Sequence, residues 1–314
     1  MQPDGAMKNT AHPVSAPAQH HSLFDWMRLF GVAVLWGTAF ILLKTAVAQI
    51  PPPTVVMERL WIGSFALLVW MKIRGHKLPR LWPVPDRRWL WFAALGLTGG
   101  TVPFALVSWG QQRLDSALVG ILMAIMPLTT AALAHLFVPG ERLSARKIAG
   151  FVLGFAGVAL LMGPDTLHHL GGAKSVAQAA VILGAMFYAV QAILARNLPP
   201  TSPSVAAAGL LLCAAVMITP FGLYAAWQAP APGAAALLSV LLLGLGATGL
   251  GGIVMMTIIR DSGPSFLSLS NYIMPLVAVL VGMLAGEHLG VTVWLGLVVI
   301  LAALALAGSS GGKR

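Results

Sequence analysis

Residues 125–141 read IMPLTTAALAHLFVPGE, and residues 273–287 read IMPLVAVLVGMLAGE. Both stretches begin with the same four residues, continue as an apolar run, and end in Gly-Glu at Glu141 and Glu287. Pro275 follows Pro127 by 148 residues, which is nearly half of the 314-residue chain. A repeat with this period predicts two copies of one structural unit.

Further short matches extend from these two stretches in the same order along the chain. Their offsets stay between 146 and 148 residues, which unrelated chance matches would not do. The sequence therefore indicates an internal duplication. The matched segments are 36–40 with 183–187, 52–53 with 199–200, 95–97 with 243–245, 115–116 with 261–262, and Gly150 with Gly296.

The composition excludes an ordinary water-soluble fold. Hydrophobic residues make up 58% of the chain and charged residues 9%, whereas a soluble domain carries about 25% charged residues. The single cysteine, Cys213, excludes a disulfide framework and a cysteine-based metal site. The net charge of +10 is divided among short connections, which argues against nucleic acid as a partner.

Apolar runs of membrane-spanning length account for most of the chain. A bilayer core of about 30 Å requires roughly 20 apolar residues as helix. We therefore predict an all-α integral membrane protein with ten transmembrane helices. The expected spans are 29–48, 54–71, 89–111, 116–138, 146–162, 176–194, 205–227, 234–259, 265–285 and 291–307.

The Lys and Arg residues predict the orientation. With a cytoplasmic amino terminus, only Arg113 and Lys174 of the 19 lie in external connections, while Lys44 and Arg59 lie within spans. Both termini are therefore expected in the cytoplasm. Five helices are an odd number, so the second copy enters the membrane inverted, as in many secondary transporters. The expected parts are a disordered cytoplasmic tail (1–27), a first five-helix repeat (28–165), a second, inverted repeat (173–308) and a cytoplasmic tail (309–314).

Several of these motifs resemble a known family. The segment WGTAFILLKTA in the first span, Arg59 in the second, and the repeated Pro followed by Gly-Glu are similar to the ten-helix EamA-type branch of the drug/metabolite transporter superfamily. The resemblance covers about residues 28–308. It implies a multi-pass protein of the bacterial inner membrane that exports small metabolites, with amino-acid exporters prominent among its relatives. It does not fix the substrate.

Polar and aromatic residues on a few spans predict a substrate pocket. Rings supply apolar area and amide, hydroxyl or ammonium groups fix the orientation of a small molecule. Interhelical packing is the alternative for each of these residues. The candidates are Trp36, Phe40 and Lys44, Ser108 and Trp109, Tyr188 and Gln191, and Asn271 and Tyr272.

Ionisable groups inside a membrane are costly, so each is a candidate for function. Lys44 either attracts a substrate carboxylate or extends its ammonium to the outer interface. We expect Glu58 and Arg59 near the outer interface, although the family resemblance adds weight to Arg59. His135 is expected to be a packing residue, with a proton relay as the alternative.

The prolines and glutamates of the repeats have other expected roles. Pro127 and Pro275 interrupt helical hydrogen bonding at matching positions and predict hinges, with Pro103 as a third. Glu141 and Glu287 end the fourth and ninth spans on opposite sides, where they are expected to cap backbone or to pair with Arg.

These features predict a transporter rather than an enzyme. The sequence contains no catalytic cluster, phosphate loop or zinc motif, so no cofactor and no metal is expected. No Lys or Arg lies between Arg196 and Arg260, which disfavours a phosphate clamp and favours neutral or zwitterionic solutes, amino acids above all.

Energy coupling and assembly have several expected outcomes. Since no carboxylate is expected near the midplane, we predict facilitated transport by alternating access. A proton-coupled drug or metabolite pump remains the alternative, and a lipid-acting enzyme is a weaker one. The expected partners are a small-molecule substrate and the lipid bilayer, and the chain is expected to be a monomer or a weak homodimer.

Overall fold

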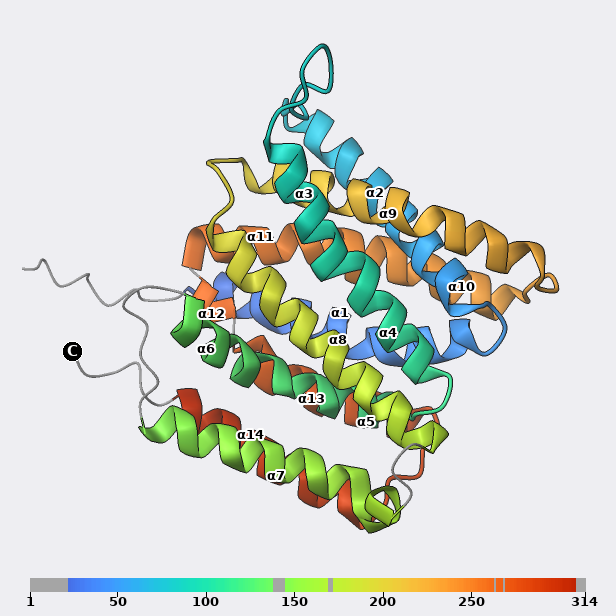
Figure 1. Cartoon of the computed structure of the whole chain (residues 1–314), viewed down its shortest axis with the longest axis vertical. Coiled ribbons are helices and arrows are strands. Elements are labelled where there is room, and N and C mark those ends of the chain that lie inside the picture. The colour runs from blue at the N-terminus through green and yellow to red at the C-terminus, as the bar shows by residue number, and fades with distance from the viewer. Residues whose placement is uncertain (1–21, 138–144, 169–171, 263, 268, 309–314) are drawn as a thin grey trace, which may run out of the picture.

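The computed structural model describes residues 22–137, 145–168, 172–262, 264–267 and 269–308. Within these ranges the chain is a bundle of ten apolar helical segments that run alongside one another (Figure 1). In chain order they are α1 (Leu23–Val47); α2 (Pro52–Ile73); α3 (Arg88–Gly96), η1 (Leu97–Thr101) and α4 (Val102–Gln111); α5 (Ser116–Leu122), η2 (Met123–Ile125) and α6 (Met126–Phe137); α7 (Ala145–His168); α8 (Ala173–Arg196); α9 (Pro203–Trp227); α10 (Ala234–Leu242), η3 (Leu243–Leu250) and α11 (Gly251–Ser262); α12 (Pro264–Leu267) and α13 (Ser270–Leu284); and α14 (Val291–Gly308).

Length and hydropathy of these helices match a bilayer. Among the described residues, seven helices have at least 18 residues and are apolar enough to cross a membrane, and three shorter apolar helices accompany them. Apolar side chains such as Phe65, Leu90 and Trp227 cover the outside of the bundle, with exposed fractions of 70%, 75% and 91%. Such a surface is stable only against lipid. The predicted all-α membrane fold is confirmed.

The first helix begins earlier than expected. Ser22 caps it, since its hydroxyl accepts from the Asp25 backbone N–H while the Asp25 carboxylate accepts from the Ser22 N–H. The prediction that the tail extends to residue 27 is therefore wrong for Leu23–Met27. The rest of that tail (1–21), the tail at 309–314 and Glu141 lie outside the described residues.

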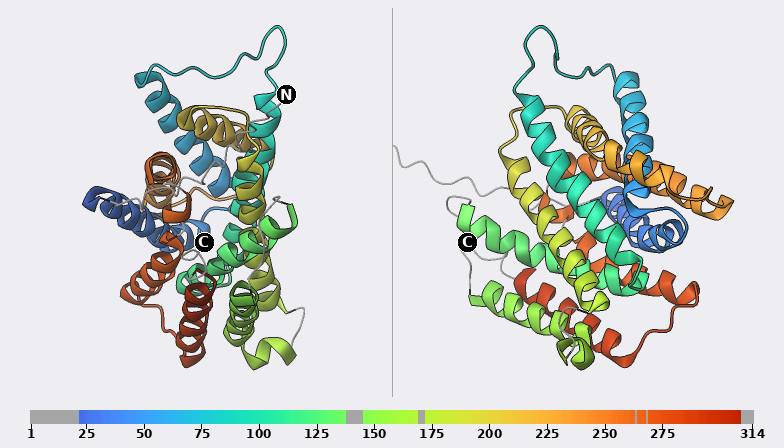
Figure 2. Two further views of the ribbon diagram at one scale, coloured as in Figure 1. Left: turned by 90° about the vertical axis from the view of Figure 1, so that its left-hand side faces the viewer. Right: turned by 45° about the vertical axis from the view of Figure 1, so that its right-hand side comes forward.

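The two halves of the chain pack mainly against each other. α2 lies on α9, α7 on α14, and α1 on α13, while α8 contacts α4 and α6 (Figure 1). These pairs are related by exchanging the halves: the first helix of each half packs against the fourth of the other, and the second helices pack together. Figure 2 shows the connection between α2 and α3 projecting beyond this bundle.

Glycines allow close approach at the pair α7 and α14. A Cβ at Gly157 would lie 2.8 Å from Ile300 Cγ1, and a Cβ at Gly154 would meet Leu128 and Ala303. Gly154 and Gly157 of the fifth helix therefore pack against helices of the same chain.

In the part of the chain that the structure describes, four membrane helices depart from regular α geometry. The third and eighth contain π-helical turns, η1 and η3, and the fourth contains a 3₁₀ turn, η2, just before Pro127. The ninth, expected as one span over 265–285, is instead divided into α12 and α13. There the Leu269 and Tyr272 amides donate to carbonyls three residues back, which tightens the backbone.

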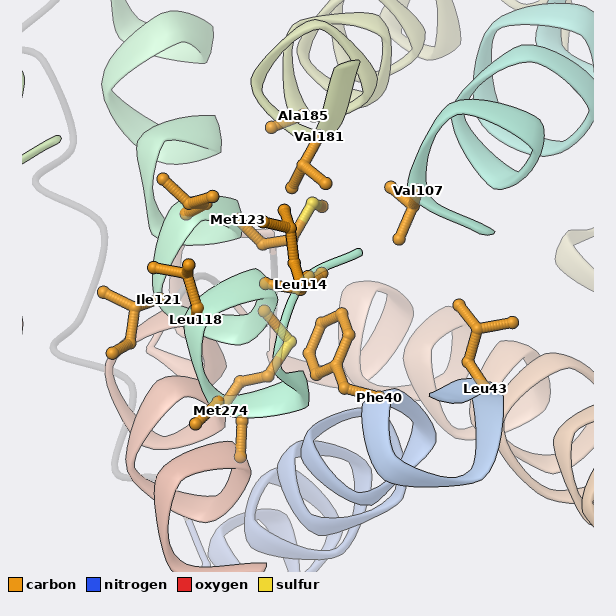
Figure 3. Packing of buried hydrophobic residues seen from close by; sticks show 14 of the residues in the cluster. Phe40, Leu43, Val107, Leu114, Leu118, Ile121, Met123, Val181, Ala185 and Met274 are labelled. Atoms are coloured by element: carbon orange, nitrogen blue, oxygen red, sulfur yellow. The ribbon is translucent and has the colours of Figure 1, made fainter. Parts of the chain in front are cut away.

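The largest group of buried side chains lies where the halves meet. It joins Phe40 of α1, Val107 of α4, Val181 of α8 and Met274 of α13. Figure 3 shows the Phe40 ring beside Met274 and Leu114. The interrupted third and eighth helices also contact helices of the opposite half.

Candidate functional site

The two π-helical segments occupy matching positions in the repeats. The segment Leu97–Thr101 begins at the last residue of the motif Leu95-Gly96-Leu97, and the segment Leu243–Leu250 begins at the first residue of the matching motif Leu243-Gly244-Leu245. A π turn accommodates an extra residue and alters the hydrogen bonding of nearby carbonyls, and such turns occur frequently at functional sites. Each segment lies near the middle of its membrane helix and is contacted from the other half.

Trp36 and Arg59 contact the segment η3. The Trp36 indole Nε1 donates to the Ala247 carbonyl at 3.2 Å, and the Arg59 Nε and one terminal nitrogen donate to Thr248 Oγ1 at 3.3 and 3.1 Å. A Cβ at Gly63 would lie 2.7 Å from the Thr248 methyl, so the second and eighth helices pack closely here. The first two helices of one half are therefore hydrogen-bonded to the π-helical turn of the other.

Arg59 is buried rather than interfacial. Its side chain is 7% exposed, and its guanidinium carbon lies 3.9 Å from the centre of the Phe104 ring. Phe104 also contacts the Tyr188 ring, with ring centres 6.2 Å apart. The expectation of an interfacial Arg59 is wrong, because helix α2 turns this residue toward α4 and η3 and not toward lipid.

Gln191 contacts the other π-helical segment, η1. Its side-chain amide packs directly on the backbone of Gly99, where any Cβ would collide with it. Two residues further, the Thr101 hydroxyl donates to the Ala214 carbonyl of α9 at 3.2 Å. The sixth and seventh helices thus contact η1 as the first and second contact η3. Trp36, Tyr188 and Gln191 are the predicted binding residues that the structure places around these segments.

The remaining predicted binding residues have other neighbours. Phe40 is 8% exposed in the core, and the Tyr272 hydroxyl donates to the Leu304 carbonyl of α14 at 2.5 Å. Ser108 is fully buried with no hydrogen-bond partner among the described residues. The Arg113 guanidinium carbon lies 4.7 Å from the centre of the Trp109 ring. Asn271 is half-buried near the start of α13.

Lys44 belongs to an ion cluster at one end of the bundle. Its Nζ lies 2.5 Å from Asp115 Oδ1 and 3.1 Å from Glu287 Oε1. The Glu287 carboxylate also accepts from the Ser116 and Ala117 amides, at 2.8 and 3.1 Å, and thereby caps helix α5. The expected capping role of Glu287 is present, but it caps a helix of the other half and pairs with lysine, not arginine.

Charge and hydrogen bonding at Glu287 shift its titration. Burial raises the pKa of the Glu287 carboxyl, but the hydrogen bonds from Ser116, Ala117 and Lys44 oppose this and leave the pKa below its ordinary value of 4.5.

A matching ion pair lies at the other end of α1. Arg28 lies 3.1 Å from Asp261 Oδ2 of the eighth helix. Asp261 occupies the repeat position that corresponds to Asp115. The two equivalent aspartates therefore pair with two cations of a single helix, one at each end.

The predicted hinge residues lie beside the irregular turns. Pro103 is the second residue of α4, directly after η1, and Pro127 is the second residue of α6, directly after η2. Pro275 lies within α13, downstream of the break from α12. Among the described residues, no group of three or more His, Cys, Asp or Glu side chains could hold a metal ion.

Sequence reasoning underrated Arg59 and missed its partners. The available signal was that Arg59 and Lys44 are the two Lys or Arg residues that lie about a turn inside the ends of the expected spans. Phe104 and Thr248 carried no such signal, because aromatic and hydroxyl residues are common in membrane helices. The sequence analysis identified Asp115 and Asp261 only as matching positions of the repeat and did not predict their ion pairs.

Comparisons with known proteins agree with this architecture. The model of the EamA-like transporter family matches twice, at residues 27–163 and 176–309. A relative from Escherichia coli K12, "Uncharacterized inner membrane transporter YedA", is 26% identical over 88% of both chains. A "Probable terminal-alkyne amino-acid exporter" from Streptantibioticus cattleyicolor is 27% identical over 52% of this chain and 53% of its own.

A solved crystal structure has a similar fold. It aligns with a TM-score of 0.64 at 21% identity and covers 93% of this chain and 99% of its own. At this identity the likeness concerns the fold alone. The two family matches cover well over half of the chain, and the chain therefore belongs to the EamA-like transporter family, within the drug/metabolite transporter superfamily.

Proposed function

We propose that this transporter exports amino acids, aromatic ones or other neutral and zwitterionic small metabolites, across the bacterial inner membrane by alternating access. The observation that carries the proposal is the pair of π-helical segments, each contacted near mid-helix by polar or aromatic side chains of the opposite half. Irregular backbone at membrane depth is tolerated where it is enclosed by protein or lines a cavity. In transporters built from inverted repeats such backbone commonly forms the substrate site.

The side chains around these segments favour a small zwitterion. Trp36, Phe104 and Tyr188 offer aromatic surface, Gln191 an amide and Arg59 a positive charge. Arg59 is the one Lys or Arg that is buried among the side chains the structure describes. A phosphate ester with two charges would call for more cations than this. The name of the Streptantibioticus relative, an amino-acid exporter, points the same way.

The ion pairs at the two ends of α1 support alternating access. Arg28 with Asp261 and Lys44 with Asp115 and Glu287 tie α1 to the opposite half at each end. We propose that Arg28 faces the cytoplasm and Lys44 the periplasm, that each pair breaks when its side opens, and that Pro103, Pro127 and Pro275 allow the helices to bend.

Counterflow in proteoliposomes tests the transport proposal. Vesicles preloaded with a mixture of the common amino acids are placed in trace amounts of each labelled amino acid. We expect trans-stimulated uptake of at least one. A channel gives no trans-stimulation, a lipid-acting enzyme gives altered molecules instead of exchange, and either outcome contradicts the proposal.

We further propose that export is facilitated and not tightly coupled to protons. With equal substrate on both sides, an imposed pH gradient should then produce no net accumulation. Accumulation that disappears in Glu58→Gln or His135→Ala would refute facilitated export and identify the proton carrier.

A further inference from the structure

The hydrogen bonds of Arg59 use only part of its guanidinium. A guanidinium carries five N–H donors, and here Nε and one terminal nitrogen point at a single acceptor, Thr248 Oγ1. The Phe104 ring covers one face of the group. No other hydrogen bond joins it to a described residue, although only 7% of the residue is exposed. A cation with this little compensation in a membrane protein is costly, which makes it a candidate for binding.

The acidic side chains that the structure describes form no ion pair with Arg59, and one of them, Asp86, pairs with Arg88. Asp115 and Glu287 pair with Lys44 at one end of the bundle, and Asp25 and Asp261 flank Arg28 at the other. Glu58, the neighbour of Arg59 in sequence, forms no ion pair with it, since adjacent residues of a helix point in different directions. A permanent counter-ion for Arg59 is therefore lacking in the described part of the chain.

We infer that Arg59 binds the carboxylate of the transported substrate, an inference that rests on the proposed function and names the group that recognises its substrates. A guanidinium offers a planar pair of donors that fits one carboxylate in bidentate geometry. Stacking on Phe104 fixes the plane of the group, and the bond to Thr248 fixes its rotation. The remaining edge is thus prepared for an acceptor before the substrate arrives.

The neighbours of Arg59 extend this assignment. The Tyr188 ring packs against Phe104 and supplies aromatic surface beside the proposed carboxylate position. Thr248 follows Ala247, the residue whose carbonyl accepts from Trp36. A substrate held by Arg59 therefore lies next to the π-helical turn of the eighth helix, between helices of both halves. Amino alcohols, which keep the ammonium and the side chain but lack the carboxylate, should be excluded.

The experiment compares matched solutes and matched variants in counterflow. Each amino acid that exchanges through the wild-type protein is tested beside its amino alcohol, for example L-phenylalanine beside L-phenylalaninol. The variants are Arg59→Gln, Arg59→Lys and the control Arg113→Gln. Arg113 also lies over an aromatic ring, Trp109, but its side chain is exposed. Size-exclusion profiles and thermal unfolding of each purified variant report whether it folds.

We expect the wild-type protein to exchange the amino acid at least about tenfold better than the amino alcohol. Exchange should fall at least about tenfold in Arg59→Gln, while Arg113→Gln stays close to wild type. Arg59→Lys keeps the charge but not the bidentate geometry. It should therefore raise the half-saturating concentration of the amino acid and lower the ratio of amino-acid exchange to amino-alcohol exchange, which is the preference ratio. This preference ratio remains a test if Arg59→Gln does not fold.

Two kinds of outcome separate this inference from the proposed function. Exchange of amino acids that is equal in Arg59→Gln and Arg113→Gln, an unchanged preference ratio in Arg59→Lys, or equal exchange of amino alcohols would overturn the role of Arg59 and leave amino-acid export intact. Failure of the wild-type protein to exchange any amino acid would overturn the proposed function and this inference with it.

Discussion

At some glycines of this bundle, the lack of a side chain allows two helices to pack closely. Gly99 is the clearest position, because the Gln191 amide occupies the volume that a Cβ at residue 99 would need. Gly31 offers the opposite case, since it is exposed and has no neighbour within 4 Å of the Cβ position. The same substitution is therefore expected to have opposite effects at two helical glycines.

We predict that Gly99→Ala lowers stability by about 1–3 kcal/mol through overpacking. Gly31→Ala should be neutral or slightly stabilising, because alanine favours the helix. Thermal unfolding of the purified proteins in detergent measures both. In the double variant Gly99→Ala, Gln191→Ala the lost stability should largely return, and a strictly additive double variant would contradict the contact.

At Glu287 we predict a loss of stability on removing the charge. Glu287→Gln removes the ion pair to Lys44 and weakens the cap on Ser116 and Ala117, at a cost of about 1–2 kcal/mol. Asp115→Asn should cost less than about 1 kcal/mol, because the Asp115 side chain is 54% exposed. Equal losses in the two variants would contradict the cap.

The lowered pKa of Glu287 also gives a prediction for pH. The carboxylate stabilises the folded protein fully above its ordinary pKa of 4.5, and this stabilisation is lost as the pH falls through the lower folded value. Unfolding temperatures of the wild-type protein should therefore drop more steeply below pH 4.5 than those of Glu287→Gln. Parallel curves for the two proteins would show that another carboxylate dominates.

At the scale of elements, α1 links both ends of the molecule. Arg28 and Lys44 are 16 residues apart, roughly 24 Å along the helix. Each pairs with an aspartate at equivalent repeat positions, Asp261 and Asp115. The helix α1 thus carries ion pairs to the opposite half at both of its ends, and shifting it along its axis would strain both sets.

Neutralising these cations should move the conformational equilibrium in opposite directions. In a Cys213→Ser background, Ser108→Cys on α4 is labelled by an impermeant maleimide from the side of Lys44. We predict more labelling with Lys44→Gln and less with Arg28→Gln, while the exposed Lys72→Gln serves as a control. A change of the same sign in both variants would count against two opposing closures.

The irregular elements were only partly predictable from sequence. Pro127 and Pro275 predicted interruptions of their helices, because a proline can be recognised in the sequence and lacks the backbone N–H of a helical hydrogen bond. The π-helical turns could not be read in this way, since their cost is offset by partners such as Trp36 and Gln191 that come from the other half. Lys44 was identified as important, but its partners Asp115 and Glu287 lie 71 and 243 residues away in sequence.

At the scale of the whole molecule, length, hydropathy and the repeat were sufficient for the fold. Ten apolar runs and one nearly constant offset leave few arrangements in a bilayer. The depth and direction of a side chain were not available in this way, which is why Arg59 was expected near the interface. Only the packing of α2 against α9 and η3 decides which of its faces is enclosed.

The orientation of the whole chain is a further prediction. In a Cys213→Ser background, Lys77→Cys between α2 and α3 should react with an impermeant reagent only in inside-out vesicles, and Lys174→Cys only in right-side-out vesicles. Both native side chains are exposed, so access is not limited by packing. Labelling of a tagged carboxyl terminus from outside intact cells would contradict a cytoplasmic location.

The dominance of contacts between the halves has a consequence for biosynthesis. When the ribosome has completed α7, the helices made so far still lack α9, α13 and α14, against which α2, α1 and α7 pack. The cap of α5 also cannot form before Glu287 is translated, 171 residues after Ser116. We therefore expect the early helices to form a loose, protease-sensitive intermediate in the bilayer, and we expect a nascent chain truncated before α13 to be degraded.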